Sequence, residues 1–255
     1  MRRLLIPLLI WIVFATDARA DDRNGLVGIT GKDDRQSMEL TDYPWRAIGR
    51  VNRRVDAGHC TGTLIGPRHV LTAAHCLWYN RTQKFLPATA LHFVAGYKRA
   101  EYVAESKVAA VRFGSAFDAR REKELSNVTH DWAVLTLADP IGEQTGVIPV
   151  ATDTNQILMG MKIVQAGYSQ DRKHILTVVD GCTAKGRSEE IAGVTLLFHD
   201  CDATHGDSGS PILTFRDGLP ELLAVHSATL HLDNGGEIGV ALPVPFIPLT
   251  TNDMK

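Results

Sequence analysis

The amino-acid sequence predicts an all-β protein made of two lobes, and two observations lead to this prediction. Short hydrophobic runs of strand length, separated by turn residues, recur along the chain, whereas long stretches of helical periodicity are missing. About six such runs precede the turn-rich segment 138–150, and about six follow it. We therefore expect two β-lobes of similar size, over residues 43–140 and 141–255.

Each expected strand combines apolar and β-branched residues, which suit a pleated, half-buried backbone. In the first lobe the runs lie at 47–51, 60–66, 69–74, 91–97, 102–113 and 132–137. In the second lobe they lie at 162–168, 175–181, 194–200, 210–215, 222–228 and 239–244.

The charge of the chain argues against two classes of partner. Its 255 residues, 44% hydrophobic and 22% charged, have ordinary globular composition, and the net charge is only -2. The arginine-rich runs 50–54 and 119–123 contain no aromatic residues, so they are expected to be solvated surface. We expect no nucleic-acid partner and no contact of the mature protein with a membrane.

The first twenty residues have the pattern of a secretory signal. Two arginines precede an apolar run from Leu4 to Phe14, and Ala18 and Ala20 form the small-residue pattern that signal peptidases cut. We expect cleavage after Ala20, a propeptide or N-terminal arm over residues 21–42, and a soluble protein that is secreted or periplasmic.

Export makes disulfides possible, and the four cysteines fall in two neighbourhoods. The economical pairing joins Cys60 to Cys76 and Cys182 to Cys201. The competing hypothesis is a zinc site, because His59 and His75 stand beside cysteines. Since the chain contains neither CxxC nor HExxH, structural bridges and no metal are expected.

Three polar residues stand out as candidates for chemistry. Ser208 lies between Gly206 and Gly209, which permit a tight turn that projects a hydroxyl and gathers N–H groups at one point. A serine nucleophile needs a base that is itself oriented by a third group, and His75 and Asp131, each beside an apolar run, are candidates. Spacing alone leaves open that each is an ordinary core or turn residue.

The segments "VLTAAHC", "HDWAVLTL" and "GDSGSP", in this order, resemble the three signature segments of the chymotrypsin-like serine endopeptidases of the trypsin fold. The order histidine, aspartate, serine differs from that of α/β-hydrolases and subtilisins. The resemblance covers residues from about 43 to 246. It implies two six-stranded antiparallel β-barrels with the active site in the cleft between them, protein or peptide substrates, a monomer and no cofactor.

The resemblance also assigns roles to individual residues. It implies that Ser208 attacks the scissile carbonyl, that His75 transfers the proton, and that Asp131 orients the imidazole. The N–H groups of Gly206 and Ser208 would form the oxyanion hole, and Ser227 matches the serine that supports the catalytic aspartate.

Within the family the chain resembles the bacterial glutamyl endopeptidase (V8-like) branch. Ser210 stands where digestive enzymes usually have a third glycine, and three prolines near the C-terminus exclude the long terminal helix of trypsins. Activation departs from the trypsin pattern. Asp207 stands where a new N-terminal ammonium would pair, but no Ile-Val-Gly-Gly start occurs.

The specificity pocket shows conflicting signals. Asp202, six residues before Ser208, stands where trypsin-like members bind Lys or Arg, and Gly239 resembles a pocket-wall glycine. Against this, His226 stands where V8-like enzymes bind an acidic side chain, although Ala203 replaces their supporting threonine. In a third alternative Asp202 pairs with His226 or with a backbone amide and selects nothing. The expected preference is Lys or Arg before the cut.

Two other functions are weighed against an active secreted endopeptidase. A catalytically silent binding protein on the same fold is disfavoured because the three residues and Gly206 are intact. A simple esterase would use the same chemistry. Asn80 and Asn127 lie in glycosylation sequons that would be used only in a eukaryotic host.

Overall fold

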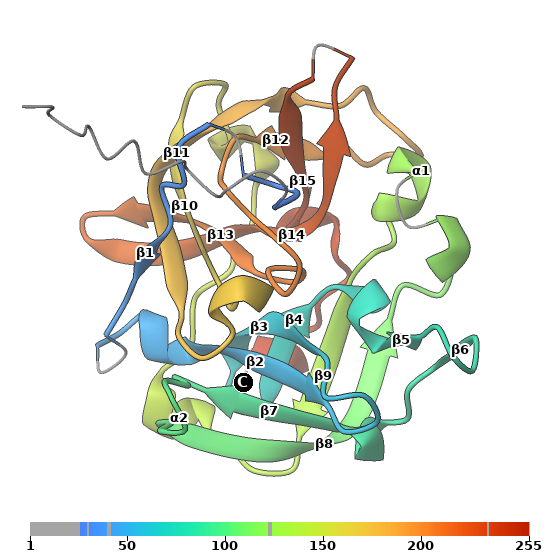
Figure 1. Ribbon diagram of the computed structural model, residues 1–255, viewed down its shortest axis with the longest axis vertical. Helices are drawn as coiled ribbons and strands as arrows, with labels where there is room; N and C mark the ends of the chain where they lie inside the picture. Colours follow the sequence, from blue (N-terminus) through green and yellow to red (C-terminus); the bar gives the residue numbers. More distant parts are fainter. Residues whose placement is uncertain (1–25, 30, 40–41, 122–123, 234, 255) are drawn as a thin grey trace, which may run out of the picture.

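The computed structural model describes residues 26–29, 31–39, 42–121, 124–233 and 235–254, so the expected signal segment 1–20 lies outside the described residues. Two β-barrels lie one above the other, and the chain passes from the first to the second near its middle (Figure 1). The expected all-β fold of two six-stranded antiparallel barrels is confirmed. Each of the twelve predicted runs overlaps one barrel strand.

The first barrel closes in the order β2-β3-β4-β9-β8-β7, with every pair antiparallel. Its strands are β2 (Ile48–Arg53), β3 (His59–Gly66), β4 (His69–Thr72), β7 (Leu91–Ala95), β8 (Ala104–Phe113) and β9 (Ala133–Leu137). The first half of β8 alternates between buried and exposed residues, as a strand with one face on the core must. A separate hairpin, β5 (Trp78–Tyr79) with β6 (Lys84–Phe85), lies outside this barrel.

The second barrel consists of β10 (Lys162–Gly167), β11 (Thr177–Arg187), β12 (Leu197–His199), β13 (Pro211–Arg216), β14 (Leu219–His231) and β15 (Glu237–Pro243). It closes because the last residues of β11 pair with β12. The first residues of β11 also pair with β1 (Gln36–Ser37), a two-residue strand of the N-terminal arm.

Helical segments are short and connect the strands. The α-helical ones are α1 (Leu125–Val128) and α2 (Gly142–Thr145). The 3-10 turns are η1 (Trp45–Ala47), η2 (Ala74–Leu77), η3 (Ala88–Ala90), η4 (Ala119–Arg121), η5 (Thr154–Gln156), η6 (Gln170–Arg172), η7 (Val244–Phe246) and η8 (Thr251–Met254). No helix among the described residues combines the length and apolar character needed to cross a bilayer.

The two barrels are joined by buried contacts. One cluster of buried apolar side chains extends through both of them. Tyr168 of the second barrel is fully buried, and its hydroxyl donates to the carbonyl of Tyr97 at 3.1 Å and accepts the N–H of the same residue at 2.9 Å. These contacts fix the orientation of one barrel relative to the other. A site built from residues of both barrels requires this.

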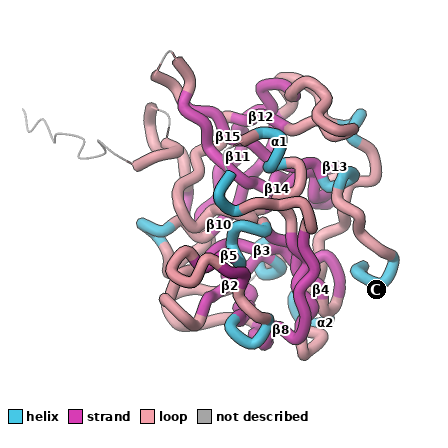
Figure 2. Tube along the Cα trace, turned by 90° about the vertical axis from the view of Figure 1, so that its right-hand side faces the viewer, coloured by secondary structure: helices cyan, strands magenta, loops and turns pink. Residues whose placement is uncertain are grey.

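Each terminal segment lies on the opposite barrel. The arm pairs with β11 of the second barrel, whereas η8 lies against β3 of the first, near the lower right of Figure 2. Arg112 of β8 fixes η8 through an ion pair from Nη2 to Oδ2 of Asp253 at 2.6 Å.

The two glycosylation sequons differ in accessibility. Asn80 is exposed, whereas Asn127 is 4% exposed and its side-chain amide exchanges hydrogen bonds of 2.8 Å with the backbone of Asp118. In the folded protein only Asn80 is available for modification.

Candidate active site

A cleft of about 540 Å³ lies between the two barrels. From the N-terminal half of the chain it is lined by His59, His75 and Trp78, among others, and from the C-terminal half by Gly206, Ser208 and His226. The structure therefore brings the candidate histidine and the candidate serine, 133 positions apart in the sequence, to one cavity.

His75 lies in the short turn η2, directly after β4. The disulfide between Cys60 and Cys76 ties this turn to β3, with a Cα–Cα distance of 6.0 Å. The backbone N–H of His75 donates to Oδ1 of Asp131 at 2.9 Å, and Nδ1 of its ring lies 2.7 Å from Oδ2. Because a carboxylate accepts, Nδ1 carries the proton, and Nε2 is left as the basic nitrogen.

Asp131 is fully buried between α1 and β9. The hydroxyl of Ser227 donates to its Oδ2, in the supporting position that the resemblance implies. Burial acts to raise the pKa of Asp131, but the charge and hydrogen bonds of His75 and the Ser227 hydroxyl lower it overall. Asp131 is therefore a carboxylate that fixes the tautomer of His75 and would stabilise its imidazolium.

Ser208 lies on a turn that requires glycine on both sides. Gly206 and Gly209 have φ of 94° and 80°. A Cβ on Gly206 would lie 2.4 Å from the carbonyl oxygen of Tyr168, and one on Gly209 would lie 2.4 Å from that of Thr61. The N–H of Thr61 also donates to the carbonyl of Ser208 at 2.9 Å, so strand β3 fixes the turn directly.

Hydrogen bonds to the preceding carbonyls fix the directions of the Gly206 and Ser208 N–H groups. The carbonyl of His205 accepts the N–H of Gln170 at 2.6 Å, and the carbonyl of Asp207 accepts that of Ser210 at 2.9 Å. In a trans peptide the N–H points opposite to the carbonyl. The N–H groups of Gly206 and Ser208, which have no partner among the described residues, are thereby available to an anion.

The carboxyl of Asp207 is enclosed by the second barrel itself. Oδ2 accepts the Ser169 hydroxyl at 2.7 Å and the Thr204 N–H at 2.8 Å. Burial raises the pKa of Asp207 to about 6. Among the described residues, no amino group bonds to this carboxyl, in contrast to the trypsin pattern.

The zinc hypothesis fails on the chemistry of the sulfur atoms. Cys60, His75 and Cys76 do lie close together, but the two sulfurs are bonded to each other and cannot act as thiolate ligands. His59 lines the cleft, and its Nε2 donates to the Tyr168 carbonyl at 2.7 Å. The second expected bridge, between Cys182 and Cys201, braces β11 against the segment that precedes the Ser208 turn.

His226 lines the cleft, and its partner is His199, a residue that no local sequence pattern marks. Nδ1 of His226 lies 3.1 Å from Nε2 of His199 in β12. Nδ1 of His199 accepts the N–H of Cys201 at 3.3 Å, so in the neutral ring Nε2 carries the proton and donates it to His226. In the neutral tautomer that follows, His226 carries its own proton on Nε2.

Both buried histidines are neutral at neutral pH. Burial lowers the pKa of His199 to about 4. The pKa of His226 is lowered well below its usual value by burial first, then by the positive charges that His199 and His75 can carry. The pair therefore offers a neutral N–H donor to the cleft.

Gly239 and Asp202, which the resemblance places in the specificity pocket, do not line the cleft. A Cβ on Gly239 would lie 2.2 Å from Cε1 of His199, so this glycine makes room for the His199 ring and is not among the residues that line the cleft. Asp202 is also absent from the lining, and its Oδ2 accepts the N–H of Asp34 at 2.9 Å. The structure thus favours the alternative in which a backbone amide takes up Asp202.

Comparisons with known proteins agree with this geometry. The sequence model "Trypsin" matches residues 32–249. Glutamyl endopeptidase of Bacillus licheniformis is 27% identical over 210 residues, which cover 78% of this chain and 60% of that protein. Serine protease 23 of Mus musculus is 30% identical over 204 residues, which cover 74% of this chain and 49% of that protein.

A solved structure supports the same fold. A Glu endopeptidase in complex with MPD superposes with a TM-score of 0.67 at 23% identity, covering 86% of this chain and 96% of that one. The chain spans less than two thirds of the length of either relative named above.

Proposed function

The chain belongs to the trypsin family, whose sequence model covers most of its length, and on that premise we propose that it is a serine endopeptidase that uses His75, Asp131 and Ser208. The observation that carries the proposal is the arrangement around one cleft. A serine on a turn that only glycine permits faces the same cavity as a histidine held by a buried carboxylate.

Acylation follows from this arrangement. Nε2 of His75 takes the proton of the Ser208 hydroxyl as Oγ bonds to the scissile carbonyl carbon. The carbonyl oxygen gains negative charge and accepts the N–H groups of Gly206 and Ser208, each worth roughly 3 to 4 kcal/mol in comparable enzymes. The C–N bond then breaks as His75 gives the same proton to the leaving amine.

Deacylation repeats the steps with water. His75 takes a proton from water, the hydroxide oxygen bonds to the acyl carbon, and the ester bond to Oγ breaks as the proton returns to Ser208. Asp131 keeps the imidazolium of His75 correctly oriented during both acylation and deacylation. Every step uses groups of this chain alone, so a monomer that acts on peptides or proteins is sufficient.

The preference before the cut is proposed to be acidic. The neutral His226 offers a donor to the cleft, whereas Asp202 is outside it, and this favours a carboxylate guest over Lys or Arg. A hydrogen bond to a charged acceptor contributes about 1.5 to 3 kcal/mol. The similarity to glutamyl endopeptidase of Bacillus licheniformis supports the same preference.

Secretion is part of the proposal. Residues 1–20 have the signal pattern, and two disulfides are bonds that persist in oxidising compartments. The alternative of a catalytically silent binding protein is disfavoured because the hydrogen bonds from His75 and Ser227 to Asp131 are complete.

A peptide library tests the proposal. Wild-type protein and Ser208→Ala are incubated with the library and the products are sequenced by mass spectrometry. Cleavage that depends on Ser208 and follows Glu or Asp is expected. A profile dominated by Lys or Arg would refute the acidic preference, and equal cleavage by the variant would refute the function.

A further inference from the structure

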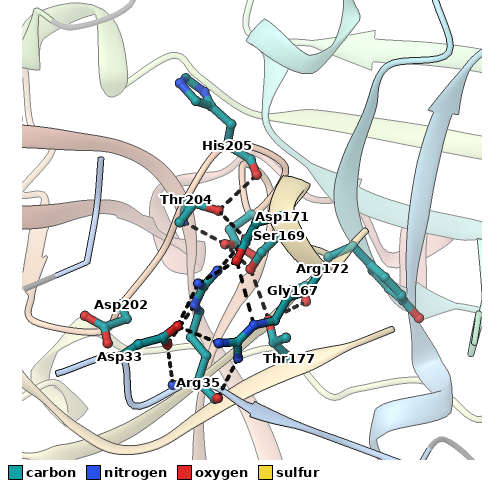
Figure 3. A network of polar contacts seen from close by, with 12 residues as sticks. Asp33, Arg35, Gly167, Ser169, Asp171, Arg172, Thr177, Asp202, Thr204 and His205 are labelled. Atoms are coloured by element: carbon teal, nitrogen blue, oxygen red, sulfur yellow. Dashed lines mark hydrogen bonds and ion pairs between the residues drawn. The ribbon is translucent and has the colours of Figure 1, made fainter. Parts of the chain in front are cut away.

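A network of ion pairs around the buried Arg35 and Asp33 joins the N-terminal arm, whose described residues are 26–29 and 31–39, to the second barrel, and Figure 3 shows the side chains converging. The Arg35 side chain is 1% exposed, and its Nη1 and Nη2 donate to the two oxygens of Asp171 at 2.8 and 2.9 Å. Its Nε and Nη2 donate to Asp33, both at 3.0 Å. Arg172 adds bonds to Asp33 at 2.5 Å and to the Arg35 carbonyl at 2.8 Å.

This geometry makes Arg35 the centre of the network. The planar guanidinium binds one carboxylate with two parallel hydrogen bonds and a second carboxylate from its other edge. Because the group is buried, losing either carboxylate would leave charge without its full compensation. The arm and Asp171 are therefore expected to stay together as a unit.

Asp171 lies in η6, the turn that is bonded to the peptide between His205 and Gly206, whose N–H belongs to the proposed oxyanion hole. Its neighbour Gln170 donates the 2.6 Å hydrogen bond to the His205 carbonyl, which directs the Gly206 N–H the opposite way. Thr204 lies at the same junction, with Oγ1 3.5 Å from Oδ1 of Asp171 (Figure 3).

The same arm also contacts the segment that leads into the catalytic turn. The N–H of Asp34 donates to Asp202 at 2.9 Å, and the carbonyl of Gly28 accepts the N–H of Ala203 at 2.9 Å. Asp207, whose bonds come from Ser169 and Thr204, has no ammonium partner among the described residues. The segment 202–207 is thus held by backbone groups of the arm at one end and by side chains and amides of the second barrel at the other.

We propose that Arg35 is a positioning residue: by holding Asp171 and η6, it keeps the Gly206 N–H aimed into the cleft. The proposal rests on the proposed function, since it concerns the oxyanion hole of that site. It makes the bound arm a condition for a competent oxyanion hole.

Arg35→Gln tests this, with Arg112→Gln as the matched control, because Arg112 ties the other terminal segment to a barrel away from the cleft. Both variants are checked for cooperative thermal unfolding. For Arg35→Gln we expect kcat to fall at least about tenfold with KM within about twofold, the pattern of an interaction made in the transition state. Arg112→Gln should keep wild-type kcat.

Hydrogen exchange gives a readout that needs no turnover. Amides of residues 202–209 should exchange faster in Arg35→Gln than in wild type. In Arg112→Gln their exchange rates should equal those of wild type. Unaltered exchange in folded Arg35→Gln would overturn the proposal, even if the protein proved not to be a protease. Where the wild type is active, unaltered kcat would overturn it too.

Two further variants cover a failure of Arg35→Gln to fold. Asp171→Asn keeps the shape of the side chain but removes its charge, and the same faster exchange and lower kcat are expected. Arg35→Lys keeps the charge without the two-pronged geometry, so it should recover only part of the rate. Wild-type exchange and rate in folded Asp171→Asn would contradict the proposal.

Discussion

The ring of His199 meets that of His226 edge-on, with Nε2 of the first 3.1 Å from Nδ1 of the second. The contact exists because Gly239, opposite His199 in the β12–β15 pairing, has no side chain to occupy the space of the ring. A histidine outside the cleft thereby fixes the tautomer of a histidine that lines it.

His199→Phe tests this relationship. The ring volume is kept but the donor to Nδ1 of His226 is lost, so the proton of His226 is no longer confined to Nε2. We expect kcat/KM for substrates with Glu before the cut to fall about tenfold, on the order of one charged hydrogen bond. Progress curves with matched substrates that carry Glu or Ala before the cut measure the ratio of the two kcat/KM values, the Glu-to-Ala ratio.

His92→Phe is the control for this prediction, because His92 lies in β7 of the first barrel and does not line the cleft. The Glu-to-Ala ratio should be unchanged in it. An unchanged ratio in His199→Phe would show that the histidine pair does not determine the preference.

The difference between predicted and observed pockets has a physical origin. Counting six residues back from Ser208 assumes that the preceding loop follows the same path as in trypsins. Here the carboxylate of Asp202 accepts the N–H of Asp34 in the N-terminal arm, and Asp202 is not among the residues that line the cleft. His199 could not be identified from local pattern, because its role depends on Gly239, forty residues further along the chain.

The pH dependence of stability should reveal Asp207. Its pKa is raised by burial from 3.8 to about 6 in the folded protein. A raised carboxyl pKa contributes stability that is complete below pH 4 and is lost as the pH rises through about 6. The stability of wild type relative to Asp207→Asn should therefore decrease between pH 4 and pH 7.

Urea unfolding of wild type and Asp207→Asn between pH 4 and pH 7 measures the difference in their free energies of unfolding. The buried histidines contribute a pH dependence of opposite sign, but they are present in both proteins, so their contribution cancels in this difference. Asp180→Asn, at an exposed carboxyl, is the control for the removal of a carboxylate as such. A difference that rises with pH would contradict the buried, raised carboxyl.

The disulfides should differ in their effect on activity. Removing a native bridge costs about 2 to 5 kcal/mol in small secreted domains. Cys60→Ala/Cys76→Ala should also lower kcat, because this bridge holds the η2 turn of His75 against β3. Cys182→Ala/Cys201→Ala should lower the melting temperature with a smaller effect on kcat.

Melting curves and kcat values of the two double variants test this difference. Equal losses of kcat at equal melting temperatures would show that the first bridge has no particular role at the site. Mass mapping of unreduced wild type should show the two linked peptide pairs and no free thiol.

How much of the fold was predictable depends on element length. The barrel strands were visible because each lies in a hydrophobic run of five or more residues, such as the run 102–113 that contains β8. The two-residue strands β1, β5 and β6 are shorter than any period can reveal. The contact of β1 with β11 joins residues about 140 positions apart, and no local signal records it.

Covalent labelling with a fluorophosphonate at neutral pH tests directly whether Ser208 is the nucleophile. Oγ of Ser208 should displace fluoride, and digestion with mass spectrometry should place one adduct on the peptide that contains Ser208. Labelling should be lost in Ser208→Ala and slowed at least about a thousandfold in His75→Ala, since the triad acts as a unit. No adduct on folded wild-type protein, or an adduct that persists in Ser208→Ala, would show that Ser208 is not the nucleophile.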